Sequence, residues 1–217
     1  MPRELHDHFF REAKREGYRS RAAYKLIEID DRRHLLKPGD AVLDCGAAPG
    51  SWLQVAADRV GPKGHVVGID LKSIDPAGLP GHVHLVEGDL TTMEARELLG
   101  GIDAFDVVLS DMAPSTTGDR TIDHHGSVRL CHAVIDRCGE VLKPGGKIAL
   151  KVLEGETYPA LLERARSFFG NVKGFKPKAS RDQSTEIYLI AEDFTGESTR
   201  PRNTATNKPR PRGWGAS

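Results

Sequence analysis

Short runs rich in β-branched and other apolar residues alternate with longer helical patterns along most of the chain, and this alternation limits the possible folds more than any other feature. The expected strands are Ala41–Asp44, His65–Asp70, Val83–Val86, Phe105–Ser110, Lys147–Leu153 and Glu186–Ala191. Helices are expected near residues 20–35, 51–60, 92–99, 124–142 and 157–169. Alternation of this kind is typical of a mostly parallel sheet covered by helices, so the sequence predicts an α/β fold.

The length of 217 residues suits one α/β domain with a short appendage. We expect a domain over residues 1–194 that begins with a basic helical segment, followed by a disordered basic tail over 195–217. No window approaches the roughly eighteen apolar residues of a membrane helix, and the N-terminus lacks the apolar segment of a signal peptide. We therefore expect a cytoplasmic protein.

Charge and cysteine content exclude two further classes of protein. Lysine and arginine total 31, as do aspartate and glutamate, which excludes a uniformly basic coat for nucleic acid but not a local basic face. The odd number of cysteines, three, argues against a disulfide framework, so we expect buried free thiols.

The first expected strand leads into a glycine-rich turn, Asp44-Cys-Gly-Ala-Ala-Pro-Gly50. Gly46 and Gly50 allow the backbone to turn tightly and approach a ligand, and the following helix presents unpaired N–H groups. Asp70 ends the second strand, where it could accept hydrogen bonds from both ribose hydroxyls. Asp89 follows the third strand and could meet an adenine edge. The sequence predicts a nucleoside-like ligand at this edge of the sheet.

A dinucleotide enzyme is the rival interpretation, because Asp70 suits it equally well. However, the turn lacks the G-x-G-x-x-G pattern, and Asp44 stands where it would repel a pyrophosphate but could hold a cationic amino group. S-adenosylmethionine combines adenosine, a sulfonium and an ammonium, so it fits better. A simpler alternative makes Asp44 a turn residue and Asp70 a strand-end cap, although acids at three successive strand ends disfavour it.

Five segments carry motifs that occur in order along the chain. They are Tyr18–Leu26, Asp44–Gly50, Ser110–Pro114, Ala149–Lys151 and Ser184–Tyr188. Together these segments resemble the FtsJ family of ribosomal RNA ribose 2′-O-methyltransferases, over about residues 8 to 192. The resemblance implies a Rossmann-like S-adenosylmethionine-dependent methyltransferase fold, with a seven-stranded, mostly parallel sheet and helices on both faces.

The resemblance also implies which residues act. The catalytic tetrad would be Lys25, Asp111, Lys151 and Glu186. The expected cofactor contacts, from the turn and from the resemblance, are Asp44, Gly46, Gly50, Trp52, Asp70, Asp89, Leu90 and Asp111. The implied substrate is a uridine of 23S ribosomal RNA in the large ribosomal subunit. We expect a monomer with no membrane partner and no metal.

The tetrad suits the chemistry of ribose methylation. A 2′-hydroxyl must lose its proton as it attacks the methyl group, yet a lysine with the ordinary pKa of roughly 10.4 carries a free amine in only about one molecule in a few thousand at neutral pH. A second ammonium and partial burial would increase that fraction, whereas a carboxylate mainly orients the amine. Our hypothesis makes Lys151 the base or hydroxyl-orienting group, Lys25 its electrostatic partner, Asp111 the bridge to the cofactor and Glu186 the orienter of both lysines.

A purely structural or surface role is a weaker explanation for some of these residues than for others. Lys151 stands between apolar neighbours in an expected buried strand, where a charged side chain is rarely accidental. Lys25 and Glu186, taken alone, would be read as surface residues. The loop after Asp111 offers no aromatic side chain to stack a flipped base and no cysteine nucleophile, which favours methylation of a sugar oxygen and therefore RNA.

Two basic runs flank the tetrad positions and are expected to line one phosphate-binding groove. They are Arg11, Lys14, Arg15, Arg19 and Arg21, then Lys173, Lys176, Lys178 and Arg181. The pairs His124-His125 and His6-x-His8 are expected to be structural, because no acid or cysteine completes a metal site. Trp214 in the tail could stack on a base or be solvated.

Two alternatives to the expected function stay open. One is a transfer-RNA ribose 2′-O-methyltransferase of the same superfamily. The other is a non-catalytic RNA-binding or ribosome-assembly factor that has kept the pocket.

Overall fold

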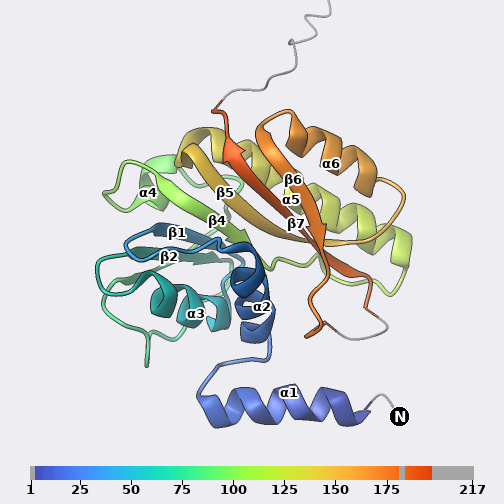
Figure 1. Cartoon of the computed structure of the whole chain (residues 1–217), viewed down its shortest axis with the longest axis horizontal. Coiled ribbons are helices and arrows are strands. Elements are labelled where there is room, and N and C mark those ends of the chain that lie inside the picture. Colours follow the sequence, from blue (N-terminus) through green and yellow to red (C-terminus); the bar gives the residue numbers. More distant parts are fainter. Residues whose placement is uncertain (1–2, 181–183, 197–217) are drawn as a thin grey trace, which may run out of the picture.

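The computed structural model describes residues 3–180 and 184–196, with side chains from residue 8 onward. The expected tail from residue 197, including Trp214, lies outside the described residues, as does Arg181. The strands are β1 (Ala41–Cys45), β2 (His65–Asp70), β3 (Val83–Glu87), β4 (Phe105–Ser110), β5 (Leu142–Leu153), β6 (Phe169–Phe175) and β7 (Glu186–Phe194). They form a single seven-stranded sheet in the order β3-β2-β1-β4-β5-β7-β6 (Figure 1).

One strand of this sheet, β7, runs against all the others. Strands β3, β2, β1, β4 and β5 pair in parallel, whereas β7 runs antiparallel to both β5 and β6. The predicted mostly parallel α/β sheet is confirmed. Parallel strands end at the same edge, so the residues that follow β1, β2 and β4 lie close together.

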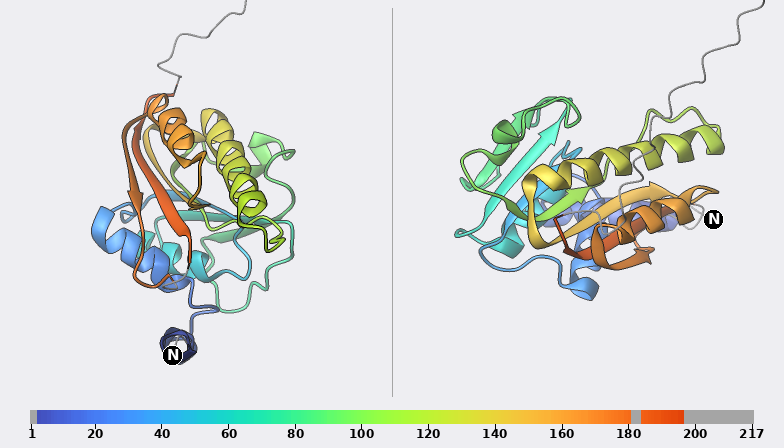
Figure 2. Two further views of the ribbon diagram at one scale, coloured as in Figure 1. Left: turned by 90° about the vertical axis from the view of Figure 1, so that its right-hand side faces the viewer. Right: turned by 90° about the horizontal axis from the view of Figure 1, so that it is seen from above.

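Helices cover both faces of the sheet, as predicted (Figure 2). The helices are α1 (Arg3–Glu16), α2 (Ala23–Arg33), α3 (Ser51–Val60), α4 (Ala95–Leu99), α5 (Arg120–Val141) and α6 (Tyr158–Arg166). Apolar side chains of α2 and α3, such as Leu26 and Leu53, form one buried core with the sheet. The core on the other face takes Leu98, Val134 and Leu161 from α4, α5 and α6.

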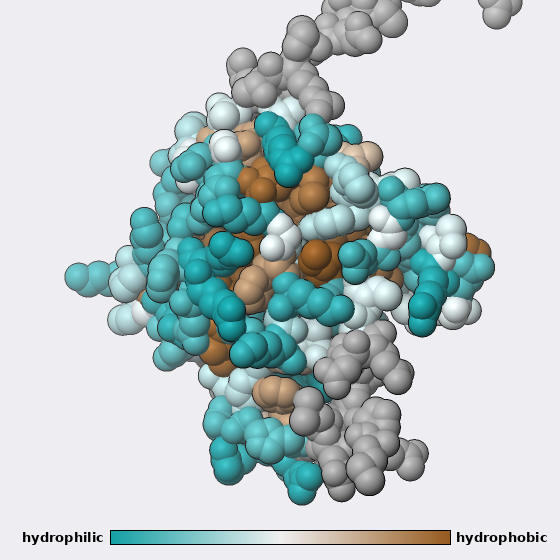
Figure 3. Space-filling view, turned by 45° about the vertical axis from the view of Figure 1, so that its right-hand side comes forward, coloured by the Kyte–Doolittle hydropathy of each residue, from teal (hydrophilic) through white to brown (hydrophobic). Residues whose placement is uncertain are grey.

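Burial of apolar side chains in these two cores leaves a mainly polar exterior. On the face shown in Figure 3, hydrophilic side chains predominate and hydrophobic ones form small patches between them. All three cysteines are buried and free, as predicted. Within the described residues, no helix is both long enough and apolar enough to cross a membrane.

Strand β6, helix α5 and strand β5 differ most from the sequence-based expectation. Strand β6 had no expected counterpart, because its residues do not alternate cleanly between buried and exposed and it contains two glycines, Gly170 and Gly174. Helix α5 begins at Arg120, not 124, because the Asp119 side chain accepts hydrogen bonds from the N–H groups of Thr121 and Ile122. Strand β5 begins at Leu142 and includes the Lys143–Gly146 stretch that was expected to precede it.

The N-terminal helix α1 stands apart from the sheet at the lower margin in Figure 1. It ends before Gly17, whose φ of +80° suits the turn that follows. Its contacts with the domain include the ring of Phe9, 5.6 Å from the ring of Tyr24, and the carboxylate of Glu16, which accepts a hydrogen bond from the Tyr24 hydroxyl. The helix is therefore anchored to α2.

Candidate active site

A cleft of about 640 Å³ opens at the carboxyl ends of β1, β2 and β4. Its position follows from the register, in which Cys45 pairs with both Ile69 and Ser110, so the segments after these residues begin side by side. Five of the expected cofactor contacts line this cleft: Gly46, Asp70, Asp89, Leu90 and Asp111. Its volume falls within the range of about 300–1,000 Å³ that small-molecule sites occupy.

The carboxylate of partly buried Asp111 and the amine of buried Lys151 form a pair beside the cleft. Lys151 Nζ lies 3.1 Å from Oδ1 of Asp111 and also donates a hydrogen bond to the backbone carbonyl of the same residue. Ser110 pairs with Leu150, so the next residue on each segment, Asp111 after β4 and Lys151 within β5, lies beside the other. Only 8% of Lys151 is exposed, which makes this the buried lysine that the apolar context of β5 predicted.

Tyr188 is a further member of this cluster that the sequence-based set of site residues lacks. Its hydroxyl donates a 2.6 Å hydrogen bond to Oδ1 of Asp111, and its ring lies 5.7 Å from that of Trp52. Burial and then the Asp111 carboxylate raise the pKa of Tyr188, so the hydroxyl keeps its proton. The available signal was the spacing: Tyr188 stands two residues after Glu186, on the same face of one strand.

Lys25 and Glu186 form the second pair. Lys25 Nζ donates a 2.9 Å hydrogen bond to Oε2 of Glu186, and Lys25 is buried although it lies on a helix. Burial acts to raise the pKa of Glu186, but the nearby charges of Lys25 and Lys151 outweigh burial and lower it. Lys151 pairs with Tyr188, two residues after Glu186 on β7, so the structure brings all four predicted tetrad residues together.

Asp44 is fully buried, and neither of its carboxylate oxygens has a hydrogen-bond partner among the described residues. Burial, followed by the charges of Asp111 and Asp70, raises the pKa of Asp44 well above its usual range. It lines a cavity of about 140 Å³ together with Trp52 and Asp111. A turn-capping carboxylate would accept backbone N–H groups, so the simpler reading of Asp44 as a turn residue does not describe this site.

Asp70 and Asp89 each have local partners as well as a place in the cleft. Asp70 accepts hydrogen bonds from the N–H groups of Ala48 and Lys72, so it does cap the strand end as the simpler reading expected. Asp89 is exposed, and hydrogen bonds from Thr91 lower its pKa. Carboxylate oxygens can each accept a second hydrogen bond, so neither local role prevents ligand binding.

The two glycines of the turn are required by neighbouring protein atoms. Gly46 and Gly50 have φ of +74° and +104°, which residues with a side chain rarely adopt. A Cβ at Gly46 would lie 2.4 Å from a side-chain carbon of Met112, and one at Gly50 would lie 2.7 Å from the guanidinium of Arg19. The turn is thus packed closely on both sides.

A family model described as FtsJ-like methyltransferase matches residues 18–194, which hold the cleft and all four tetrad residues. The chain belongs to the FtsJ-like methyltransferase family. The resemblance found in the sequence motifs is therefore confirmed.

Several curated relatives of this FtsJ-like methyltransferase are named ribosomal RNA large subunit methyltransferase E. The protein from Syntrophobacter fumaroxidans is 48% identical over 191 residues, which cover 88% of this chain and 96% of the relative. The protein from Azoarcus sp. is 46% identical, covering 89% of this chain and 95% of the relative. A crystal structure of a ribosomal RNA methyltransferase from Plasmodium falciparum matches with a TM-score of 0.73 and 32% identity, covering 83% of this chain and all of the other.

The two basic runs of this methyltransferase lie next to each other in part. Arg21 donates a hydrogen bond to the carbonyl of Ala179, and the N–H of Lys178 donates to the carboxylate of Glu28 on α2. These contacts join α2 to the segment that follows β6. Arg19 differs, because its guanidinium donates to the carbonyls of Pro49 and Ala77 beside the cleft.

His124 ties α5 to the segment that follows β5. Its Nε2 accepts a hydrogen bond from the backbone N–H of Thr157, so its Nδ1, 2.6 Å from the carbonyl oxygen of Leu153, is the donor. Gly155 has no room for a side chain against this ring, since a Cβ there would lie 2.4 Å from it. His124 is therefore structural. Among the residues that the structure describes, no group of three or more potential metal ligands occurs.

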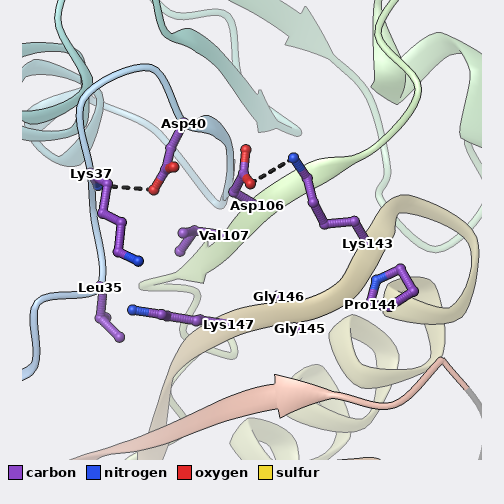
Figure 4. Close-up of a pocket in the computed structure, with 10 residues that line it drawn as sticks. All are labelled: Leu35, Lys37, Asp40, Asp106, Val107, Lys143, Pro144, Gly145, Gly146 and Lys147. Carbon is purple, nitrogen blue, oxygen red and sulfur yellow. Dashed lines mark hydrogen bonds and ion pairs between the residues drawn. The ribbon is translucent and has the colours of Figure 1, made fainter.

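A third cavity, also of about 140 Å³, lies at the opposite edge of the sheet, where β4 and β5 begin (Figure 4). Three of its charged side chains have partners: Lys143 Nζ lies 2.6 Å from Asp106, and Lys147 donates to the carbonyl of His34. The carboxyl edge, not this one, holds the tetrad.

Proposed function

We propose that this FtsJ-like methyltransferase transfers a methyl group from S-adenosylmethionine to the ribose 2′-hydroxyl of a uridine in 23S ribosomal RNA of the large subunit. The names of its relatives support ribosomal RNA as the substrate. The observation that carries the proposal is the gathering of Lys25, Asp111, Lys151 and Glu186 as two linked ion pairs beside one cleft.

The cofactor assignment rests on the fit of the cleft residues. The orphaned carboxylate of Asp44 suits the ammonium of the cofactor's amino-acid part, because a buried anion without a partner is stabilised by a cation. Asp70 and Asp89 suit the ribose hydroxyls and the adenine edge, and buried Leu90 offers an apolar wall. Gly46, Gly50 and Trp52 would shape the backbone next to them. When bound, S-adenosylmethionine supplies a methyl group that its sulfonium makes electrophilic.

We assign to Lys151 the role of accepting the proton of the 2′-hydroxyl or of orienting that hydroxyl. Two acceptors at residue 111, the carbonyl and the carboxylate, match the two N–H groups of a neutral amine and leave its lone pair for that proton. An ammonium in the same place would instead direct its third N–H at the hydroxyl oxygen. Lys151 then acts as base in the first case and as hydroxyl-orienting group in the second.

The remaining residues of the cluster hold Lys151 and its surroundings in place. Asp111 lines the cleft and also contacts Lys151, so it bridges the cofactor side and the hydroxyl side. Lys25 is the electrostatic partner in this cluster and pairs with Glu186, which would orient both lysines. Tyr188 fixes the Asp111 carboxylate with its hydroxyl.

RNA would dock along the basic face formed by Arg11, Lys14, Arg15, Arg21, Lys176 and Lys178. The contact between Arg21 and Ala179 supports one continuous face, since it joins the two runs. Lysine and arginine contacts to phosphates give affinity and orientation without reading sequence. We further propose that residues 1–194 form the catalytic domain, that 195–217 form a separate basic tail, and that the enzyme works as a cytoplasmic monomer.

A substrate panel tests this proposal. The protein is incubated with labelled S-adenosylmethionine and, in parallel, with large ribosomal subunits, free 23S RNA and transfer RNA, all from cells that lack the modification. We expect label in 23S RNA, most efficiently within the subunit. Preferential labelling of transfer RNA would favour the transfer-RNA enzyme instead. Cofactor binding without transfer to any of the three would favour a non-catalytic assembly factor.

A further inference from the structure

Arg19 connects two loops that flank the cofactor cleft. Its Nη1 donates a 2.8 Å hydrogen bond to the carbonyl of Pro49, in the turn after β1, and its Nη2 donates a 2.6 Å bond to the carbonyl of Ala77, between β2 and β3. The turn lines the cleft through Gly46 and Ala48, and the β2–β3 connection lines it through Leu71 and Lys72. One side chain therefore bridges both walls.

The backbone around Arg19 is fixed as firmly as its guanidinium. Its N–H donates to the Gln54 side chain on α3, and the hydroxyl of the next residue, Ser20, lies 2.7 Å from the Ser51 hydroxyl. Ser20 also lines the small cavity that contains Asp44. The segment between α1 and α2 thus forms part of the wall of the candidate cofactor site.

Gly50 provides an independent sign of this arrangement. The space that a Cβ would occupy at residue 50 is taken by the guanidinium and Cδ of Arg19, at 2.7 and 3.3 Å. The absence of a side chain at Gly50 is what allows Arg19 to lie directly on the turn. The close packing of Arg19 on the turn therefore requires glycine at residue 50.

We propose that Arg19 is a positioning residue for the cofactor, which holds the turn after β1 and the β2–β3 connection at the separation at which both contact one molecule. The inference rests on the proposed function, because it takes the cleft as the S-adenosylmethionine site. A guanidinium is a planar fork with several N–H groups and reaches both carbonyls at once, whereas a lysine ammonium is a single point. Arg19 is thereby assigned to the cofactor loops instead of the phosphate-binding face.

Calorimetric titration with S-adenosylhomocysteine tests this inference in the full-length chain. The Arg19→Ala and Arg19→Lys variants are both expected to bind about ten- to thirtyfold more weakly, as two hydrogen bonds are lost or reduced to one. Arg59→Ala is the matched control, because Arg59 also has two partners, Asp30 and Asp31, but does not line the cleft. It should change the affinity less than about twofold. If Arg19→Lys binds as tightly as the wild type, the bridging role is wrong.

A second readout separates positioning from a general effect on folding. Saturating S-adenosylhomocysteine raises the Tm of the wild type, and this rise depends on the affinity for the folded state. Positioning by Arg19 predicts a smaller ligand-induced rise in both variants, a raised KM for S-adenosylmethionine and a kcat near the wild-type value. A Tm that falls equally with and without ligand, or a raised KM for RNA alone, would overturn the inference. Failure of the wild type to bind the ligand would refute the proposed function itself.

Discussion

Tyr188 and Lys151 lie directly opposite each other on β7 and β5, and both side chains end on the same atom, Oδ1 of Asp111. Cross-strand partners project from the same face of a sheet, so this arrangement is set by the register of the two strands. The Asp111 carboxylate is consequently held from two sides. Its orientation depends on Tyr188, which contacts Asp111 without itself lining the cleft.

Replacing Tyr188 by Phe should lower kcat about tenfold and leave the affinity for S-adenosylmethionine within about twofold of the wild type. The variant keeps the buried ring but removes a hydrogen bond to a charged group, a type of bond worth about 1.5–3 kcal/mol. Single-turnover methyl transfer on large subunits measures the effect. A kcat equal to that of the wild type would show that the hydroxyl does not position Asp111.

Replacing Lys151 by Ala should reduce kcat by about a hundredfold or more, because general acid–base catalysis typically contributes that much. Cofactor affinity, measured by titration, should be nearly unchanged. Lys147→Ala is a suitable control, since Lys147 lies on the same strand but at the opposite edge of the sheet. Near-wild-type turnover of Lys151→Ala would remove Lys151 from the proposed role.

Cofactor affinity should increase with pH through the raised pKa of Asp44. In the free protein, burial favours the protonated carboxyl, whereas a bound ammonium favours the carboxylate, so binding releases a proton. Asp44→Asn should bind more weakly and lose this part of the pH dependence. Titrations in two buffers with different ionisation enthalpies measure the proton release. A pH-independent affinity in the wild type would contradict the assignment of Asp44.

The raised pKa of Asp44 also predicts how the stability of the ligand-free protein depends on pH. Because its folded-state pKa is raised, the folded chain binds more protons than the unfolded chain between the two pKa values, and stability should fall as pH rises through that interval. At neutral pH, Asp44→Asn should therefore raise the Tm of the ligand-free protein. A lower Tm would mean that the carboxylate has a stabilising partner.

Reversing the charges of Arg11, Lys14 and Arg15 should raise the KM for the RNA substrate at low salt and flatten its salt dependence. Each lost phosphate contact should reduce the slope of log affinity against log salt by about 0.7–0.9. Lys63→Glu serves as control, because exposed Lys63 precedes the amino end of β2, away from the tetrad. An unchanged KM at low salt would exclude α1 from the docking face.

The sequence predicted the fold well because strand and helix periodicities are local properties. Strand β6 escaped prediction since it is an edge strand whose residues meet both solvent and sheet. The tetrad was predicted from the family's motifs, because local patterns alone place Lys25 on the surface. Lys25 is buried on a helix because β7 brings Glu186 to it, 161 residues away in sequence. For Tyr188 the one local signal is its spacing from Glu186, whereas the role of Arg19 depends on contacts with distant segments that no local pattern encodes.

The most direct test of the account is the chemical position of the new methyl group. A ribose 2′-O-methyl group removes the hydroxyl that alkali needs to cleave the adjacent phosphodiester, so the labelled product should survive alkaline hydrolysis as a dinucleotide. We predict that 23S RNA methylated by this enzyme yields one such labelled, alkali-resistant dinucleotide that begins with uridine. Label released as a base-methylated mononucleotide would contradict the assignment of the cleft to a sugar oxygen.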